Sequence, residues 1–127
     1  MVDLDPRIEK DGLTESLIRA DVILKLRRAG IRVLSKEKWF DVVGNPYLYV
    51  IANILKLPET KEYIYCIRVS FKQTVYLLKE PIEILGADTW STGGRIGITP
   101  DLRKIRNSIN ELVDRFISAY LSVNPKD

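Results

Sequence analysis

One short segment of the chain combines residue types that can do chemistry. Residues 88–95 carry a carboxylate, hydroxyls, an aromatic ring and a guanidinium, and acid–base catalysis and small-molecule recognition both use such groups. If the protein has a small-ligand site, we expect it to be formed by Asp88, Thr89, Trp90, Ser91 and Arg95. A histidine-free enzyme acting through these residues is one hypothesis for the function.

The glycines Gly93 and Gly94 within this segment and Gly97 just after it allow two interpretations. A phosphate-binding loop runs from a strand straight into a helix amino terminus. Here the apolar, strand-like residues 96–98 intervene. The glycines therefore favour a turn or a β-bulge over a phosphate site.

The rest of the sequence offers few catalytic groups. It contains no histidine, which excludes Ser-His and Cys-His nucleophile pairs and the commonest metal ligand. The single cysteine, Cys66, lies near Arg68, but the favoured interpretation is a small residue packed in a sheet. The acids of residues 3–11 lack the glycine spacing of a calcium loop, so we predict no metal and no cofactor. We expect a protein that is not an enzyme.

Basic residues gather between residues 25 and 38, against the single acid Glu37. Such a cluster is the sequence's best argument for a nucleic-acid or other polyanion partner. The favoured interpretation is a solvated surface, because the net charge is only +3 and charged side chains are usually exposed. The cluster consists of Lys25, Arg27, Arg28, Arg32, Lys36 and Lys38.

The first predicted helix lies between Thr14, which can cap it, and Gly30, which can end it. Its apolar residues form two stripes on nearly opposite sides. We expect the second stripe to contact the last helix, with a partner-binding surface as the alternative. The first stripe is Ile18, Val22, Leu26 and Ala29, and the second is Leu17, Ala20 and Leu24.

Four strands are predicted after this helix. Residues 31–34 form a short one, and residues 47–57, apolar on both faces, form a central one. Residues 63–78 alternate between an apolar face and a polar face that bears Arg68 and Lys72, which indicates one face in the core and one in water. Residues 82–91 form the fourth strand. The polar loop 58–62 has the length of a hairpin loop, so the two long strands are predicted to be antiparallel.

The last helix has the clearest amphipathic pattern. We expect Thr99 to cap it and Pro100 to occupy its first position, and Asn124 and Pro125 to stop it. The predicted fold is α+β, with two helices packed on one face of an antiparallel sheet of about four strands in the order αββββα. Residues 1–12 are expected to be a flexible charged leader, residues 13–123 a single domain, and residues 124–127 a short tail.

The sequence indicates a soluble protein with no transmembrane segment, and it leaves the oligomeric state open. The amino terminus has no signal peptide as written. We expect a cytoplasmic protein, or a periplasmic or exported one if Met1 replaces a removed signal peptide.

Four strings of the sequence are notable together: KLRRAGIRV (25–33), NPYLYV (45–50), TWS (89–91) and LVDRFISAYLSVNPK (112–126). Together they resemble a family of small uncharacterised bacterial proteins. The resemblance implies no assigned activity and frequent export. The element order also resembles that of small periplasmic accessory proteins such as the lipopolysaccharide-assembly lipoprotein, which favours a protein partner.

The leading hypothesis is a non-enzymatic interaction or accessory domain. It depends on the missing catalytic groups, the two-sided first helix and the polar sheet face.

Overall fold

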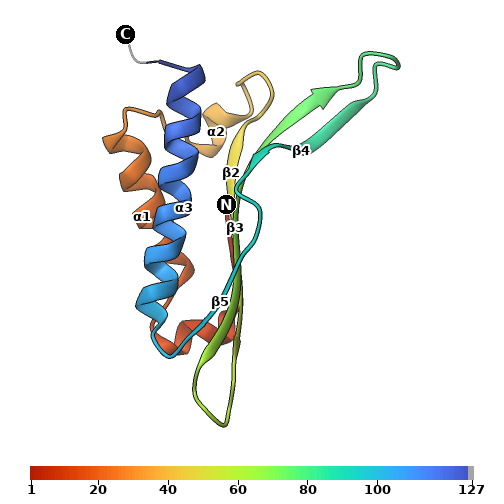
Figure 1. Ribbon diagram of the computed structural model, residues 1–127. Coiled ribbons are helices and arrows are strands. Elements are labelled where there is room, and N and C mark those ends of the chain that lie inside the picture. Colours follow the sequence, from red (N-terminus) through yellow and green to blue (C-terminus); the bar gives the residue numbers. More distant parts are fainter. Residues whose placement is uncertain (126–127) are drawn as a thin grey trace.

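The computed structural model describes residues 1–125 and contains a single sheet with helices on one side (Figure 1). Residues 126–127, the end of the expected tail, lie outside the described residues. The elements in chain order are β1 (Val2–Leu4), the 3-10 helix η1 (Pro6–Asp11), α1 (Glu15–Arg28), α2 (Lys36–Trp39), β2 (Tyr47–Lys56), β3 (Tyr63–Tyr76), β4 (Glu83–Ser91), β5 (Arg95–Thr99) and α3 (Leu102–Val123).

The sheet is built around β3, whose 14 residues make it the longest strand. Strand β2 pairs with it along one edge, while β5 and β4 share the other edge, β5 beside Tyr63 to Ile67 and β4 from Ser70 onward. All of these pairs are antiparallel, and only β1 and β2 are parallel. The predicted α+β class and largely antiparallel sheet are confirmed, but the sheet has five strands rather than about four.

The predicted order αββββα is wrong: it lacks β1, the short helix α2 and β5, and it includes a strand at residues 31–34. A strand precedes α1, and residues 31–34 form no strand. The outer edge of β2 is occupied by β1, with Val2 opposite Val50 and Leu4 opposite Ala52. Ile31 and Val33 still pack against the core, so their apolar character indicated burial and not strand pairing.

The leader expected to be flexible is folded onto the sheet. Val2, Leu4 and Ile8 are buried in the core, while Asp3 between them points the other way and accepts a hydrogen bond from the Tyr49 hydroxyl at 3.2 Å. The charges concealed a short period-2 pattern, in which apolar residues alternate with a polar one.

Both long helices cover the same face of the sheet, as predicted, and the core lies between them and the strands (Figure 1). The inner sheet face contributes Val50, Ala52, Ile67 and Val69, and all four are buried. From the helices, the fully buried side chains are Ile18, Ile105, Ile109, Leu112 and Val113.

The helix caps match the predictions at one helix and not at the other. The Thr14 hydroxyl accepts from the Leu17 amide at 3.1 Å, as an N-cap does. At α3 the N-cap is Asp101, which accepts from the Arg103 amide at 2.9 Å. The helix therefore begins two residues later than predicted, and Thr99 instead closes the preceding turn by accepting from the Asp101 amide.

Contrary to expectation, the two helices meet through polar residues. Asp21 forms a bidentate ion pair with Arg106, at 2.6 and 2.8 Å, and Lys25 binds Asp114 at 2.9 Å. Leu17 and Leu24 of the second apolar stripe are exposed. Residues 21 and 25 lie one turn apart and face α3, which turns the second stripe towards solvent.

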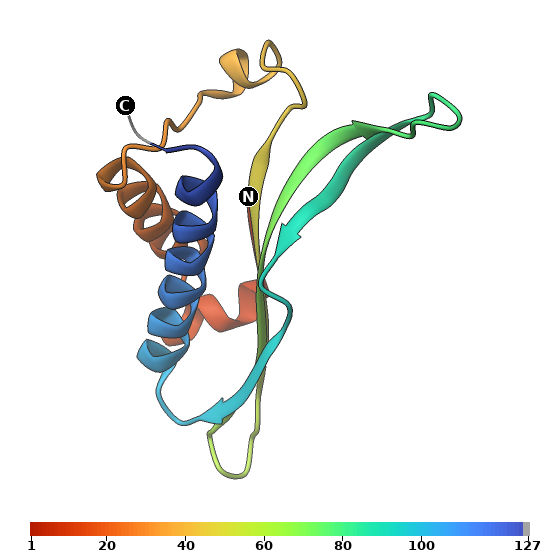
Figure 2. The same ribbon diagram turned by 45° about the horizontal axis from the view of Figure 1, so that its top comes forward.

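Beyond the body, β3 and β4 continue as a hairpin that projects away from the helices (Figure 2). The pairing of the two strands is irregular between Phe71 and Lys72 and between Gln73 and Val75. β-Bulges of this kind bend the strand that contains them. We call residues 72–88 the arm.

Candidate interaction surface

The arm carries a group of large apolar side chains that no described residue covers. Leu78 is fully exposed, and Leu85 and Tyr76 are 74% and 64% exposed. They come from both strands, because Tyr76 lies opposite Glu83 and the Leu77 amide donates to the Ile82 carbonyl at 3.1 Å. These side chains lie on both faces of the hairpin, because neighbours on a strand point to opposite sides. The members of this group, which we call the arm patch, are Tyr76, Leu77, Leu78, Ile82, Ile84 and Leu85.

Polar contacts hold the base of the arm. Lys72 pairs with Asp88 at 2.7 Å, and its ammonium lies over the Tyr49 ring, 5.6 Å from the centroid. The hydrogen bond to Asp88 raises the pKa of Lys72 above its ordinary value. Next to it, the Thr89 hydroxyl donates to Gln73 Oε1 at 2.8 Å. The arm therefore leaves the body in a defined direction.

A loop beside the arm adds two further exposed apolar residues. Phe40 and Val43 are 71% and 96% exposed. Their loop is tied to the arm where the Thr74 amide donates to the Gly44 carbonyl at 2.7 Å. Asn45, which has a positive φ of 41°, holds the loop closed by donating from its side chain to the Trp39 carbonyl.

The helices cover one face of the sheet and leave its outer face open (Figure 1). This outer face carries a second group of exposed apolar residues. The pairing places Leu55, Ile64 and Ile98 in one row across β2, β3 and β5, with Ile96 two residues along. All four are exposed. We call them the sheet patch. Neighbouring exposed apolar side chains mark interaction surfaces more often than single exposed apolar residues do.

The polar residues of the outer face occupy the register that the sequence predicts. Cys66 lies there, half-buried, opposite Asn53 and Ile96. Arg68 pairs across from Ile51, and its Nε is buried with no hydrogen-bond partner among residues 1–125.

The structure does not bring the residues of the predicted small-ligand site together. Asp88 pairs with Lys72 at the base of the arm. Trp90 turns to the helix side, where its ring packs edge-on against Phe116 at 5.5 Å. Arg95 reaches α3 and binds Glu111 at 2.6 Å.

The two hydroxyl residues of that site have structural partners. Thr89 is bound at the base of the arm as described above. Ser91 accepts from the Gly93 amide at 3.1 Å and helps to form the turn before β5. Gly93 has a positive φ of 71°, which fits the turn that the glycines predicted. None of the five residues lines the three cavities that the structure describes.

The basic cluster is spread over three segments. Lys25 is paired with Asp114, whereas Arg27 and Arg28 end α1. Arg32 lies in the connecting segment. Lys36 and Lys38 lie on α2 beside Glu37.

Metal ligands and membrane spans can be checked directly in the described residues. Within residues 1–125 no three acidic, cysteine or histidine side chains gather as a metal site would require. None of the described helices combines the length and the apolar character needed to cross a bilayer.

Sequence reasoning missed the arm patch. Residues 75–85 are apolar on both strand faces and their turn is short. This pattern is the signal that could have revealed an uncovered hairpin, but a buried strand has the same composition.

No protein-family model, curated protein or solved structure matches the chain. The family resemblance of the four sequence strings therefore stays a prediction.

Proposed function

We propose that the protein is a non-enzymatic interaction domain that binds a partner protein through the arm patch. The observation that carries this proposal is the exposure of six large apolar side chains on one projecting hairpin. Isolated two-stranded hairpins are marginally stable in water, and covering apolar surface is favourable by about 25 cal/mol per Å². A partner would gain from burying the arm patch and would also stabilise the arm.

The edge of β4 adds a second means of binding. In the described sheet β4 pairs only with β3, so its other edge presents backbone amides and carbonyls. An extended partner segment can add to such an edge as a further strand. The arm thus combines an open backbone edge with exposed apolar side chains.

The test compares a variant that introduces lysines in the arm with one that introduces a lysine elsewhere. The double variant Leu78→Lys, Leu85→Lys places two charges in the arm patch without touching the core. Val123→Lys, the control, places one charge at a 77% exposed position on α3. Purification of the tagged wild-type chain from its native cells is expected to yield a stoichiometric partner protein.

We expect the arm variant to lose this partner and the Val123→Lys variant to keep it. Both should show wild-type circular dichroism and unfolding midpoints. Retention of the partner by the arm variant, or its loss from both, would contradict the proposal. Sedimentation of the purified chain then shows whether the partner is a second copy.

A second candidate function is binding of a polyanion through the basic cluster. It is favoured by Arg27, Arg28, Lys36 and Lys38, which form no ion pair among residues 1–125. Polyanion binding weakens steeply as salt rises. Fluorescence anisotropy of a labelled RNA duplex should therefore fall with salt and with the double variant Arg27→Gln, Arg28→Gln. No binding at about 50 mM salt would exclude this function.

A further inference from the structure

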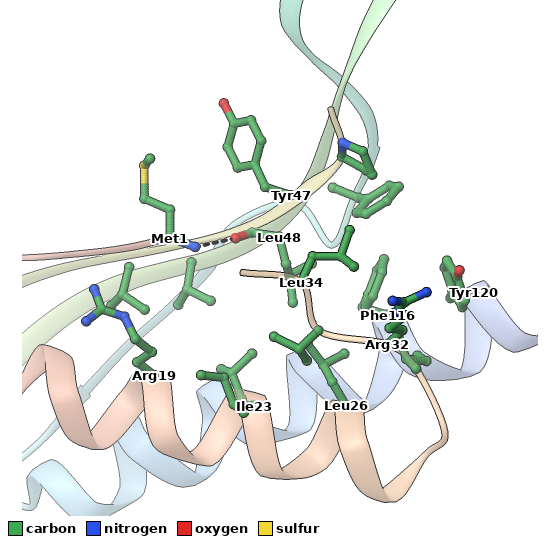
Figure 3. Close-up of a pocket in the computed structure, with 17 residues that line it drawn as sticks. Met1, Arg19, Ile23, Leu26, Arg32, Leu34, Tyr47, Leu48, Phe116 and Tyr120 are labelled. Atoms are coloured by element: carbon green, nitrogen blue, oxygen red, sulfur yellow. Dashed lines mark hydrogen bonds between the residues drawn. The ribbon is translucent and has the colours of Figure 1, made fainter. Parts of the chain in front are cut away.

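A cavity of about 300 Å³ lies between α1, the connecting segment 31–34, β2 and the end of α3 (Figure 3). Its walls are largely apolar. At its mouth the Met1 nitrogen donates to the Leu48 carbonyl at 2.7 Å, which ties the amino-terminal segment to β2. The main apolar side chains of the wall are Val22, Ile23, Leu26, Leu48, Phe71 and Phe116.

The cavity forms because the helices do not close evenly over the sheet. At the start of α1, Ile18 is fully buried against the core. Farther along, Ile23 is only partly buried and faces the open space (Figure 3). The segment 31–34, which forms no strand, passes over this space and covers it incompletely.

The charged groups around the cavity are all cationic. Arg19 of α1 and Arg32 of the connecting segment line it, and no acidic side chain does. Arg19 is already paired with Glu15, one turn earlier on α1. The Met1 ammonium also lines the cavity but already donates to the Leu48 carbonyl. Arg32 is exposed and forms no ion pair among the described residues, so we assign the anion to its guanidinium.

We propose that this cavity binds a single-chain amphiphile with an anionic head group, its alkyl chain among the apolar walls and its carboxylate at Arg32. Small-molecule sites span about 300–1,000 Å³ and combine apolar walls with a few polar groups. An apolar cavity of about 150 Å³ accepts benzene, so this volume suits a chain of roughly ten carbons. The proposal is independent of the arm and of its partner.

The first part of the test measures which head group binds. Isothermal titration with decanoate, below its micelle concentration, is compared with decyltrimethylammonium, decanol and hexanoate. We expect decanoate to bind with one-to-one stoichiometry, decanol more weakly, and the cationic and the short-chain compounds not at all. Equal binding of decanoate and decyltrimethylammonium, or no binding of decanoate, would overturn the proposal.

The second part assigns the head group to Arg32. A charge-assisted hydrogen bond stabilises by about 1.5–3 kcal/mol. Arg32→Gln should therefore weaken decanoate binding about tenfold or more and leave decanol binding unchanged. Arg28→Gln is the matched control, because it makes the same change in the same cluster at a residue outside the cavity wall. Equal effects of the two variants would overturn the assignment.

The third part locates the alkyl chain. Leu34 lines the cavity from the covering segment (Figure 3), and Leu34→Trp should fill the space and abolish binding of both decanoate and decanol. Nuclear Overhauser contacts between the decanoate chain and the methyl groups of Leu26 and Leu48 test the same point in the wild-type protein. Contacts to the arm patch or the sheet patch instead would overturn it. Binding only to vesicles that contain anionic phospholipid, and not to free decanoate, would also overturn it.

Discussion

At the scale of single residues, the ion pair between the two helices is the contact most open to measurement. Arg106 binds Asp21 through two hydrogen bonds, and it is the main reason that the pKa of Asp21 is lowered below its ordinary value. A carboxylate with a lowered native pKa stabilises the fold above its unfolded pKa. This stabilisation is lost as the pH falls through the native pKa.

Asp21→Asn is therefore expected to reduce the free energy of unfolding by about 1–2 kcal/mol at pH 7, a range that allows for solvent screening of the partly exposed Arg106. The difference from the wild type should shrink as the pH falls below about 4. Urea unfolding at pH 7 and pH 3 measures it. Asp114→Asn, which removes the more exposed ion pair with Lys25, is the control and should change the stability by less than about 1 kcal/mol. An equal loss at both pH values in Asp21→Asn would contradict this account.

Gly97 and Tyr65 offer a second test at this scale. They are paired across β3 and β5, and a methyl group on Gly97 would lie 2.5 Å from Cζ of the Tyr65 ring. Gly97→Ala should cost about 1–2 kcal/mol because the half-buried ring must move. In a Tyr65→Val background the same substitution should cost much less. Additive effects in this double-mutant cycle would show that the two residues do not interact.

The sequence predicted the positions of the helices and strands well. It predicted poorly which side chains of residues 88–95 lie together, and the reason is physical. Period-2 and period-3.6 patterns report which side of a segment is buried, and they located α1, β2, β3 and α3 to within a few residues. Where Trp90 and Arg95 point depends on the bulged pairing of β4 and on the turn before β5. No periodicity encodes either feature.

At the scale of elements, β1 is the clearest correction. The charged residues around it concealed three alternating positions, and its place beside β2 depends on pairing over a separation of almost fifty residues. Such long-range pairing leaves no local trace. The cavity also went unseen, because its walls come from α1, α3, three strands and the segment 31–34, which are distant in the chain.

Leu4→Ala tests whether β1 contributes to stability. Leu4 is 7% exposed in the core, and truncating a buried leucine costs about 2–5 kcal/mol. Asp3→Asn changes the neighbouring residue on the opposite face and is expected to cost less than about 1 kcal/mol, since it alters one exposed hydrogen bond. Denaturant unfolding compares the two variants. If Leu4→Ala had no effect, residues 1–12 would behave as the flexible leader that the sequence suggested.

The arm is expected to be dispensable for folding. Replacing residues 77–82 by Asn-Gly would connect Tyr76 to Glu83, which already lie opposite each other, by a turn suited to a two-residue hairpin. The free energy of unfolding should change by less than about 1 kcal/mol, because the tip contributes no side chain to the core. A loss of more than about 3 kcal/mol in thermal or urea unfolding would show that the arm is a structural element and not a free binding surface.

At the scale of the whole molecule, the core and the cavity lie on one side of the sheet and the exposed apolar residues lie elsewhere. The helix side of the sheet holds the core and the cavity, while the outer face and the arm remain uncovered by the described residues (Figure 2). We propose that another molecule completes this domain by covering the apolar residues of the projecting hairpin. In this proposal the molecule is a protein and it covers the arm patch.

Photo-crosslinking in the native cells tests that claim most directly. A photoreactive phenylalanine analogue replaces Leu78 or Leu85 in the arm patch and, as matched controls, Asn107 or Val123, which are exposed positions on α3. The account predicts a discrete crosslinked protein species from both arm positions and none from either control. Crosslinks of equal yield from all four positions, or crosslinks from the arm to lipid alone, would contradict it.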